Sequence, residues 1–343
     1  MADLVELDSL EILAIIDNEL DPISPCPNPL IEQTGGIRDL IMRAIRESPE
    51  EGGPVPELRM SNICCSAHGL SLMITGIKDG KKRTILFDTG PEEDVWERNA
   101  RRLRANAGQI ELITLSHWHR DHSGGMLKVL DMVSEARQQN SGDLLPITVD
   151  LHPARPDYRG AQAPGMPVIS LEADPTFEDI EAHGGTVTKN DQSHTVLDNT
   201  FLISGEIPRV SGYEAGFRFG MRFDKTKGEW EQDEKMLDER ILMCRLKNKG
   251  IVMFTGCGHA GVVNSAKHAL DLGSGVPLYA VIGGFHLADA QPDIIEQTAS
   301  DLKESGVKVL LAGHCTGWRA KAELNKQMPG TYAPCFVGSR FVL

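Results

Sequence analysis

The chain has 343 residues, of which 41% are hydrophobic and 24% charged, a composition typical of globular proteins. Its formal net charge of −14 argues against a nucleic-acid partner, because binding to a phosphate backbone depends on Lys and Arg. Seven cysteines without a CxxC pair predict reduced thiols. Neither a signal peptide nor an apolar stretch of the ~18 residues needed to span a bilayer is apparent. We therefore expect a soluble, cytoplasmic protein without a membrane partner, and leave its oligomeric state open.

Apolar runs, turn residues and helical periodicity predict the elements of the first half of the chain. In order, these are a buried strand at 10–16, an amphipathic helix at 37–46, two strands at 69–75 and 83–88 joined by an Asp-Gly hairpin turn, a charged helix at 92–107, a strand at 110–115 and a helix at 126–140. The stretch 21–57 is rich in Pro and Gly, which predicts a surface insertion. It either covers the mouth of a site or is a disordered decoration.

The second half begins with an irregular region and ends in a regular one. Residues 141–240 predict long loops that shape a pocket or are solvated excursions, with strands only at 146–151 and 200–204 and a polar loop at 222–239. After this region, strands and helices alternate. The strands are expected at 250–255, 277–282, 307–312 and 336–343, and the helices at 262–272, 292–305 and 318–328.

Three histidines and an aspartate lie within six residues directly after the strand at 110–115. On an extended chain, residues two apart point to the same side, so His117 and His119 can reach one metal ion together. Asp121 and His122 lie just beyond, where a Gly-containing turn can direct them toward a second ion. A solvated polar loop is the alternative, but the density of ligand-type side chains favours a metal site.

Three more histidines occupy equivalent positions in the C-terminal third. His259, His286 and His314 each lie in a Gly-rich turn that follows a predicted strand. In α/β proteins, polar residues at the carboxyl ends of strands assemble sites. Together with the motif at 117–122, these histidines predict one shared site.

The pattern His-x-His-x-Asp-His after a strand, with Phe87-Asp88-Thr89-Gly90 about thirty residues before it, resembles the metallo-β-lactamase-fold superfamily. The resemblance implies an α/β fold, a four-layer αββα sandwich with a mono- or dinuclear metal site between the sheets, made by residues 1–343 as a single domain. Further blocks resemble the subfamily named for the archaeal dihydropterin–ribofuranosylaminobenzene phosphate synthase. They are Ala67-His68-Gly69-Leu70-Ser71, Gly205-Glu206-Ile207-Pro208-Arg209, residues 256–264 (GCGHAGVVN), Gly283-Gly284-Phe285-His286-Leu287 and His314-Cys315-Thr316-Gly317.

The chain also departs from the superfamily pattern at two ligand positions. Cys257 stands where a bridging aspartate is usual, and the segment 233–239 has no histidine where the third one is usual. We take His259 as the replacement, with His194 as a weaker candidate. The expected ligands are therefore His117, His119 and His259 for a first ion and Asp121, His122 and His314 for a second. Imidazole and carboxylate suit one or two Zn²⁺ ions, although Mn²⁺ or Fe²⁺ would accept the same set.

Other candidate residues have two interpretations each. Asp88 orients a ligating histidine through its second ring nitrogen, or caps the following helix. Cys257 is a ligand, or a small buried residue. His286 contacts the substrate or transfers a proton, with a direct ligand role open. Arg209 holds a carboxylate or phosphate of the substrate, or forms a structural ion pair with Glu206. A last group, Cys64, Cys65 and Cys315, is expected to be structural.

The superfamily resemblance, together with the acidic character of the chain, implies a metal-dependent hydrolase of a small molecule, in which a metal-bound hydroxide attacks a cyclic amide or ester such as a lactam or lactone. Asp121 passes a proton to the leaving group, a role that its depressed pKa as a ligand opposes. The alternatives are a synthase that joins pterin-type and phosphorylated metabolites, and a non-catalytic metal- or redox-sensing module around Cys257.

Overall fold

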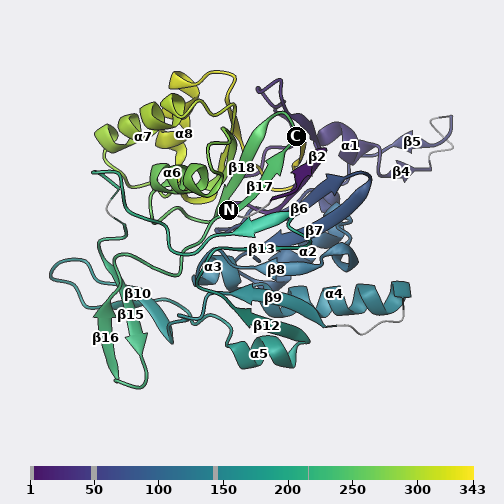
Figure 1. Ribbon diagram of the computed structural model, residues 1–343. Coiled ribbons are helices and arrows are strands. Elements are labelled where there is room, and N and C mark those ends of the chain that lie inside the picture. Colours follow the sequence, from purple (N-terminus) through teal and green to yellow (C-terminus); the bar gives the residue numbers. More distant parts are fainter. Residues whose placement is uncertain (1–3, 48–51, 142–145, 215) are drawn as a thin grey trace.

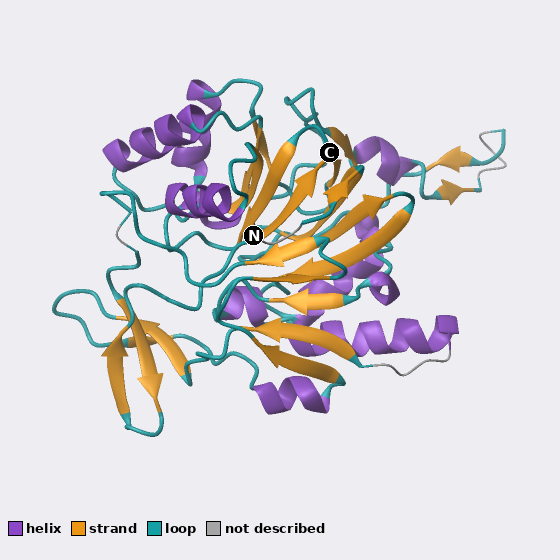
Figure 2. Cartoon of the chain, in the orientation of Figure 1, coloured by secondary structure: helices purple, strands orange, loops and turns teal. Residues whose placement is uncertain are grey.

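The computed structural model describes residues 4–47, 52–141, 146–214 and 216–343. Two eight-stranded sheets face each other, with helices on both outer faces (Figures 1 and 2). The N-terminal sheet has the strand order β12 (Gly185–Lys189), β9 (Ile147–Leu151), β8 (Leu112–Thr114), β7 (Lys81–Phe87), β6 (Ser71–Lys78), β2 (Ser9–Ile16), β22 (Arg340–Val342) and β3 (Glu32–Thr34). The predicted α/β sandwich is therefore confirmed.

The C-terminal sheet is built mainly from the second half of the chain. Its order is β13 (His194–Val196), β14 (Phe201–Ile203), β17 (Leu242–Leu246), β18 (Gly250–Thr255), β19 (Leu278–Gly284), β20 (Val309–Gly313) and β21 (Tyr332–Pro334), with β1 (Glu6–Leu7) parallel to β17. Because β18, β19 and β20 are parallel neighbours, their carboxyl ends lie at one edge of the sheet. His259, His286 and His314 follow these three strands.

Three apolar layers hold the sandwich together, and alternation along the strands creates them. In β18, Val252 and Phe254 point to the core between the sheets, whereas Ile251 and Met253 point to the outer layer, as the two-residue repeat of a strand requires. The outer layer of the C-terminal sheet packs on α6 (Val262–Leu272), α7 (Pro292–Glu304) and α8 (Trp318–Gln327). That of the N-terminal sheet packs on α2 (Glu93–Leu103), α4 (Met126–Ser141) and α5 (Phe177–Ala182).

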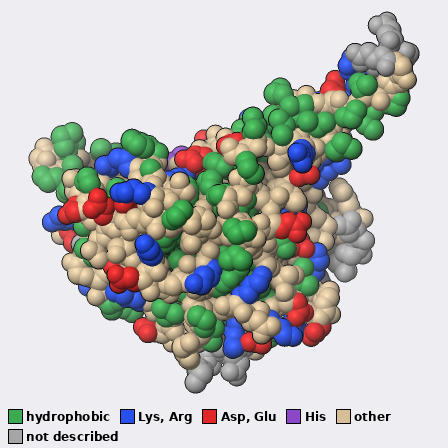
Figure 3. Space-filling model, turned by 90° about the horizontal axis from the view of Figure 1, so that it is seen from above, with side chains coloured by type: hydrophobic (Ala, Val, Ile, Leu, Met, Phe, Trp, Pro, Cys, Tyr) green, Lys and Arg blue, Asp and Glu red, His purple; other side chains and the backbone are tan. Residues whose placement is uncertain are grey.

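The insertion at 21–57 differs from the predicted one. The helix expected at 37–46 ends early, as α1 (Ile37–Ile41), and the chain then forms a hairpin of β4 (Ile45–Arg46) and β5 (Val55–Pro56). Residues 48–51 of the predicted Pro/Gly-rich connection lie outside the described residues. The hairpin projects from the body on the side away from the short helix α3 (Arg120–Ser123) (Figure 1). Figure 3 shows apolar side chains along this arm, where Met42 and Ile45 are exposed.

The polar loop expected at 222–239 is wrong, because this segment contains most of a β-hairpin. It pairs β15 (Gly220–Asp224) with β16 (Glu229–Gln232), beside β10 (Tyr158–Ala161) and β11 (Ile169–Ser170). Phe223 and Trp230 lie opposite each other with ring centroids 5.3 Å apart, and such cross-strand aromatic pairs stabilise a sheet. The alternation of charged and aromatic residues on both sides of the turn at 225–228 is the sequence pattern that could have predicted this hairpin.

Smaller elements complete the chain: the 3₁₀ helices η2 (Met60–Asn62), η3 (Ala107–Gln109) and η4 (His314–Thr316). The final strand, expected at 336–343, is limited to 340–342 and pairs with β2 in the N-terminal sheet. Among the described residues, none of the helices has both the length and the apolar character needed to cross a lipid bilayer.

Candidate metal centre

The first group of possible metal ligands joins the two sheets. His117 and His119 follow β8, and His259 follows β18; one ligand atom from each lies within 4.8 Å of the other two. His117 Nε2 is 3.0 Å from His119 Nδ1. Both ring nitrogens of His259 are buried and form no hydrogen bond with the described part of the chain. A buried polar atom without a partner is costly. A metal ion bound to one nitrogen of this ring would supply such a partner.

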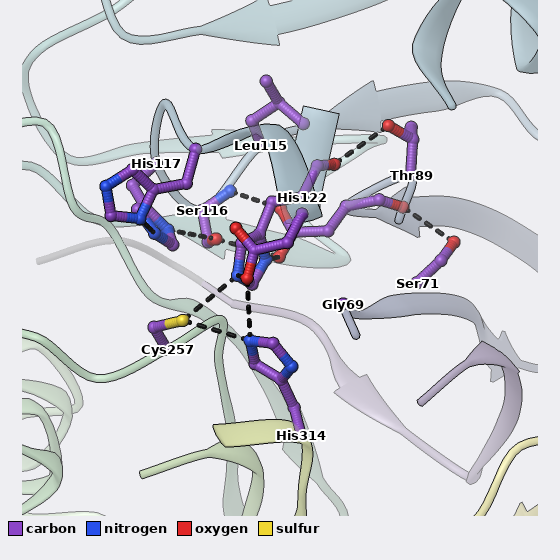
Figure 4. A network of polar contacts seen from close by, with 12 residues as sticks. Gly69, Ser71, Thr89, Leu115, Ser116, His117, His122, Cys257 and His314 are labelled. Carbon is purple, nitrogen blue, oxygen red and sulfur yellow. Dashed lines mark hydrogen bonds and ion pairs between the residues drawn. The ribbon is translucent and has the colours of Figure 1, made fainter. Parts of the chain in front are cut away.

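The second group lies beside the first and has four members (Figure 4). Cys257 Sγ is 3.2 Å from His122 Nε2 and 3.1 Å from His314 Nε2. Asp121 Oδ2 lies 3.6 Å and 3.3 Å from the same two nitrogens. Ligands about 2.0–2.3 Å from one tetrahedral ion lie roughly 3.3–3.7 Å from each other. The two spacings of Asp121 lie in this range, and those of Cys257, 3.2 and 3.1 Å, lie slightly below it. Small shifts would therefore let this group hold a metal ion, with Cys257 as a fourth donor.

Burial sets the charge of the first group. It lowers the pKa of His119 to about 3 and holds the pKa values of His117 and His259 well below the usual histidine value. These imidazoles are neutral, as metal ligands must be.

In the second group, burial alone would raise the pKa of Asp121, but His122 and His314 hold it well below its ordinary value. The opposite holds for His314: burial would lower its pKa, but Cys315 and Asp121 hold it well above. A metal ion bound by this group would replace the positive charge of His314 as the charge that stabilises the ionised Asp121.

Asp88 is the hub behind the second group. It is fully buried and accepts hydrogen bonds from Ser116 N (2.7 Å), from Ser116 Oγ (2.8 Å) and from His122 Nδ1 (2.7 Å). The proton of His122 is therefore on Nδ1, so Nε2 is free to face Cys257. The alternative role of Asp88 as a helix cap is wrong, because Glu92 occupies the cap position of α2.

Two buried carboxylates hold the histidine turns of the C-terminal sheet by their backbone. Glu239 accepts from His259 N at 2.8 Å and from Ala260 N at 2.5 Å. Asp17, at the end of β2, accepts from His314 N at 3.2 Å. Neither residue is marked by a motif, and Glu239 lies in the segment where the superfamily's third histidine is usual. It supports the main chain of His259, the residue predicted to take that histidine's place.

A cavity of about 810 Å³ opens over both groups. Besides the histidines, its lining includes Arg120, Phe217 and the strongly exposed Trp318. His286 also lines it, with its ring centroid 4.2 Å from that of His259. Cys315, expected to be structural, lies here too: its thiol, Cys257 and His286 form a third cluster of donors within 4.8 Å.

The structure places three other candidates away from these groups. His194 Nε2 is 2.9 Å from Asp150 Oδ2, so its prediction as a ligand is wrong. Arg209 donates to the carbonyl oxygens of Ile207 and Lys235. Glu206 is exposed and lines a separate cavity. No ion pair joins Arg209 to Glu206 within the described ranges, and the backbone contacts of Arg209 replace the predicted pair.

Comparison with known proteins identifies the class that this fold and site define. Residues 69–132 match the model of the Metallo-beta-lactamase superfamily. Two crystal structures share the fold: Tm1679, a metal-dependent hydrolase of the beta-lactamase superfamily (22% identity, TM-score 0.65, 96% of this chain and 98% of that one), and YhfI from Bacillus subtilis (12%, 0.50, 98% and 99%). The chain belongs to the metallo-β-lactamase superfamily.

A curated relative narrows this assignment. The 7,8-dihydropterin-6-methyl-4-(beta-D-ribofuranosyl)-aminobenzene-5'-phosphate synthase of Methanocaldococcus jannaschii is 30% identical over 258 residues, which are 75% of this chain and 83% of the relative. The chain therefore belongs to the subfamily of that synthase, as its sequence blocks predict.

Proposed function

We propose that this protein is a metal-dependent hydrolase that opens a cyclic amide or ester bond of a small molecule. The observation that carries the proposal is the pair of adjoining donor groups at the floor of a cavity of about 810 Å³, a size that suits small-molecule ligands. The three imidazoles of the first group, and the imidazole, carboxylate and thiol donors of the second, favour Zn²⁺ at both positions. His117, His119 and His259 would hold one ion, and Asp121, His122, His314 and Cys257 the other.

Zinc in such a centre makes a bound water acidic and polarises the oxygen of a carbonyl or phosphoryl group. The chain's own residues supply the rest. Burial would lower the pKa of His286, but Cys315 and Glu239 hold it above its usual value, so the imidazolium can give a proton to a leaving nitrogen or oxygen. Phe217 packs with its ring centroid 5.8 Å from those of both His259 and His286, which keeps bulk water from that side.

A synthase that joins a pterin-type and a phosphorylated metabolite is the second candidate. The named relative, matched over 83% of its length, favours it. The aromatic side chains of Phe217 and Trp318 on the cavity wall could also stack on a flat heterocycle. In this case Arg120, the only Lys or Arg among the described lining residues, would pair with the phosphate.

One panel separates the two. Zinc-loaded protein is incubated with lactams, lactones and thioesters. In parallel it is incubated with a phosphorylated ribosyl-aminobenzene and a dihydropterin that carries a leaving group on its 6-methyl carbon, with mass spectrometry of the products. Turnover of a ring substrate that is lost in Asp121→Asn and reduced in His286→Gln supports the hydrolase. Condensation of the second pair, without turnover of any ring substrate, would replace it by the synthase.

A further inference from the structure

Asn18 contacts two imidazoles of the site at once. It lies two residues after the end of β2, and its side-chain oxygen is 2.9 Å from His314 Nδ1. Its amide nitrogen is 3.0 Å from Nδ1 of His68, a residue on the cavity wall. His68 belongs to one of the subfamily blocks, but the sequence suggested no role for it or for Asn18.

The orientation of the Asn18 amide is settled by a third contact. Gly69 N donates a hydrogen bond to Asn18 Oδ1 at 3.0 Å, and a backbone N–H can only donate. If the amide were turned over, its NH₂ group would face that N–H, donor against donor. The oxygen therefore faces Gly69 and His314, and the NH₂ group faces His68.

This orientation determines where each imidazole carries its proton, because Asn oxygen only accepts and Asn nitrogen only donates. His314 must donate from Nδ1, which leaves Nε2 to face Cys257 and Asp121. His68 must accept at Nδ1, so its proton is on Nε2. That nitrogen lies 3.5 Å from Asp121 Oδ2, so the protonated nitrogen is beside the carboxylate.

The main chain around Gly69 keeps these contacts in place. Leu70 N donates to the Asp121 carbonyl at 3.3 Å, so the 68–70 segment lies against the backbone of a candidate ligand. A Cβ on Gly69 would come within 2.3 Å of that carbonyl oxygen, which explains the glycine at this position. Asp17, the neighbour of Asn18, holds His314 from its backbone side.

We infer that Asn18 is a positioning residue that fixes two tautomers: it keeps the His314 proton on Nδ1, so that Nε2 can bind a metal, and the His68 proton on Nε2, the nitrogen beside Asp121. The first half of this inference rests on the proposed metal centre; the second does not. Partners that orient ligating histidines in this way are worth about 10- to 100-fold in metal affinity.

Two substitutions separate the tasks of Asn18. In Asn18→Asp, a carboxylate still accepts from His314 Nδ1 and Gly69 N, but it cannot donate to His68, whose proton should move to Nδ1. In Asn18→Ala both contacts are lost. The exposed Asn106, changed to Ala, serves as the matched control. The readouts are ¹⁵N spectra of histidine-labelled protein at about pH 8, above the usual histidine pKa, and zinc affinity by chelator competition.

We expect Asn18→Asp to keep zinc affinity within a few-fold and to change the tautomer of His68 alone. Asn18→Ala should lose about 10- to 100-fold in affinity for one of two ions. Zinc bound through His314 Nδ1, or wild-type affinity together with an unchanged His68 tautomer in Asn18→Ala, would overturn the inference. Protein that binds no zinc but shows the His68 proton on Nε2, moved in Asn18→Asp, would refute the proposed function and still support the role of Asn18.

Discussion

Asp88→Asn tests the hub behind the second donor group with minimal change of shape. The residue has a φ of 62°, in the left-handed region that Asn tolerates as readily as Asp. The backbone should therefore stay in place. The Asn oxygen must face the N–H of Ser116, which leaves the NH₂ group at the position of Oδ2, 2.7 Å from His122 Nδ1.

The consequence is a change of tautomer in His122. Its Nδ1 must now accept, so its proton moves to Nε2, where it blocks the nitrogen that faces Cys257 and Asp121. A lost orienting partner costs about 10- to 100-fold in metal affinity, or roughly 1.4–2.8 kcal/mol at 1.4 kcal/mol per tenfold. The fold should also lose about 1.5–3 kcal/mol, the contribution of one hydrogen bond to a charged group.

Metal content per chain, zinc affinity by chelator competition and the free energy of unfolding measure these effects. Asp131→Asn is the matched control, because Asp131 also pairs with an imidazole, that of His183, at 2.8 Å, outside the candidate metal centre. If Asp88→Asn and Asp131→Asn both bind zinc as tightly as the wild type, the assignment of Asp88 as the orienting partner of His122 is refuted.

Three further substitutions examine other parts of the centre. Glu239→Gln places an NH₂ group against one of the two backbone N–H groups at 259–260 and should weaken zinc binding at the first group about tenfold or more. Glu206→Gln, at an exposed position, should not. Equal zinc affinity of the two variants would refute the role of Glu239 in holding the main chain of His259. In cobalt-substituted protein, Cys257→Ser should remove the thiolate-to-metal charge-transfer band and Cys315→Ser should keep it; the reverse would make Cys315 the ligand. Arg240→Met removes the guanidinium that lies 2.7 Å from the buried Asp150 and leaves that carboxylate with the half-buried His194 as its ionisable partner. It should lower the free energy of unfolding by about 3–5 kcal/mol, measured by denaturant titration; a loss below about 1 kcal/mol would contradict a stabilising buried ion pair.

The alternating strands and helices of the C-terminal third could be predicted from the sequence because burial alone determines their apolar pattern. The strand at 250–255 is apolar at nearly every position and is buried on both faces, so its pattern is independent of its neighbours. The segments at 37–46 and 222–239 are different. The helical periodicity of the first and the polarity of the second indicate their structure only weakly. Pairing with a second strand decides the structure, as for Ile45 with Pro56.

The same distinction applies to the site. His117, His119 and His122 are recognisable because their spacing is itself the signal. Asn18, Glu239 and Cys315 are common residue types without a characteristic spacing, and their partners lie far along the chain: Asn18 and His314 are separated by 296 positions. Only the closed sandwich brings them together, so no local pattern could have identified them.

The arrangement has a consequence for how metal binding and folding depend on each other. The first group combines two candidate ligands after β8 of the N-terminal sheet with one after β18 of the C-terminal sheet. The second combines the α3 residues Asp121 and His122 with Cys257 and His314. Neither sheet alone has either group complete. Bound ions would therefore link the two sheets, and since a ligand that binds only the folded state stabilises it by mass action, zinc should oppose separation of the sandwich halves rather than unfolding of one sheet. Asp17 and Asn18 already make such a link without metal, because they extend from β2 to hold His314 of the opposite sheet.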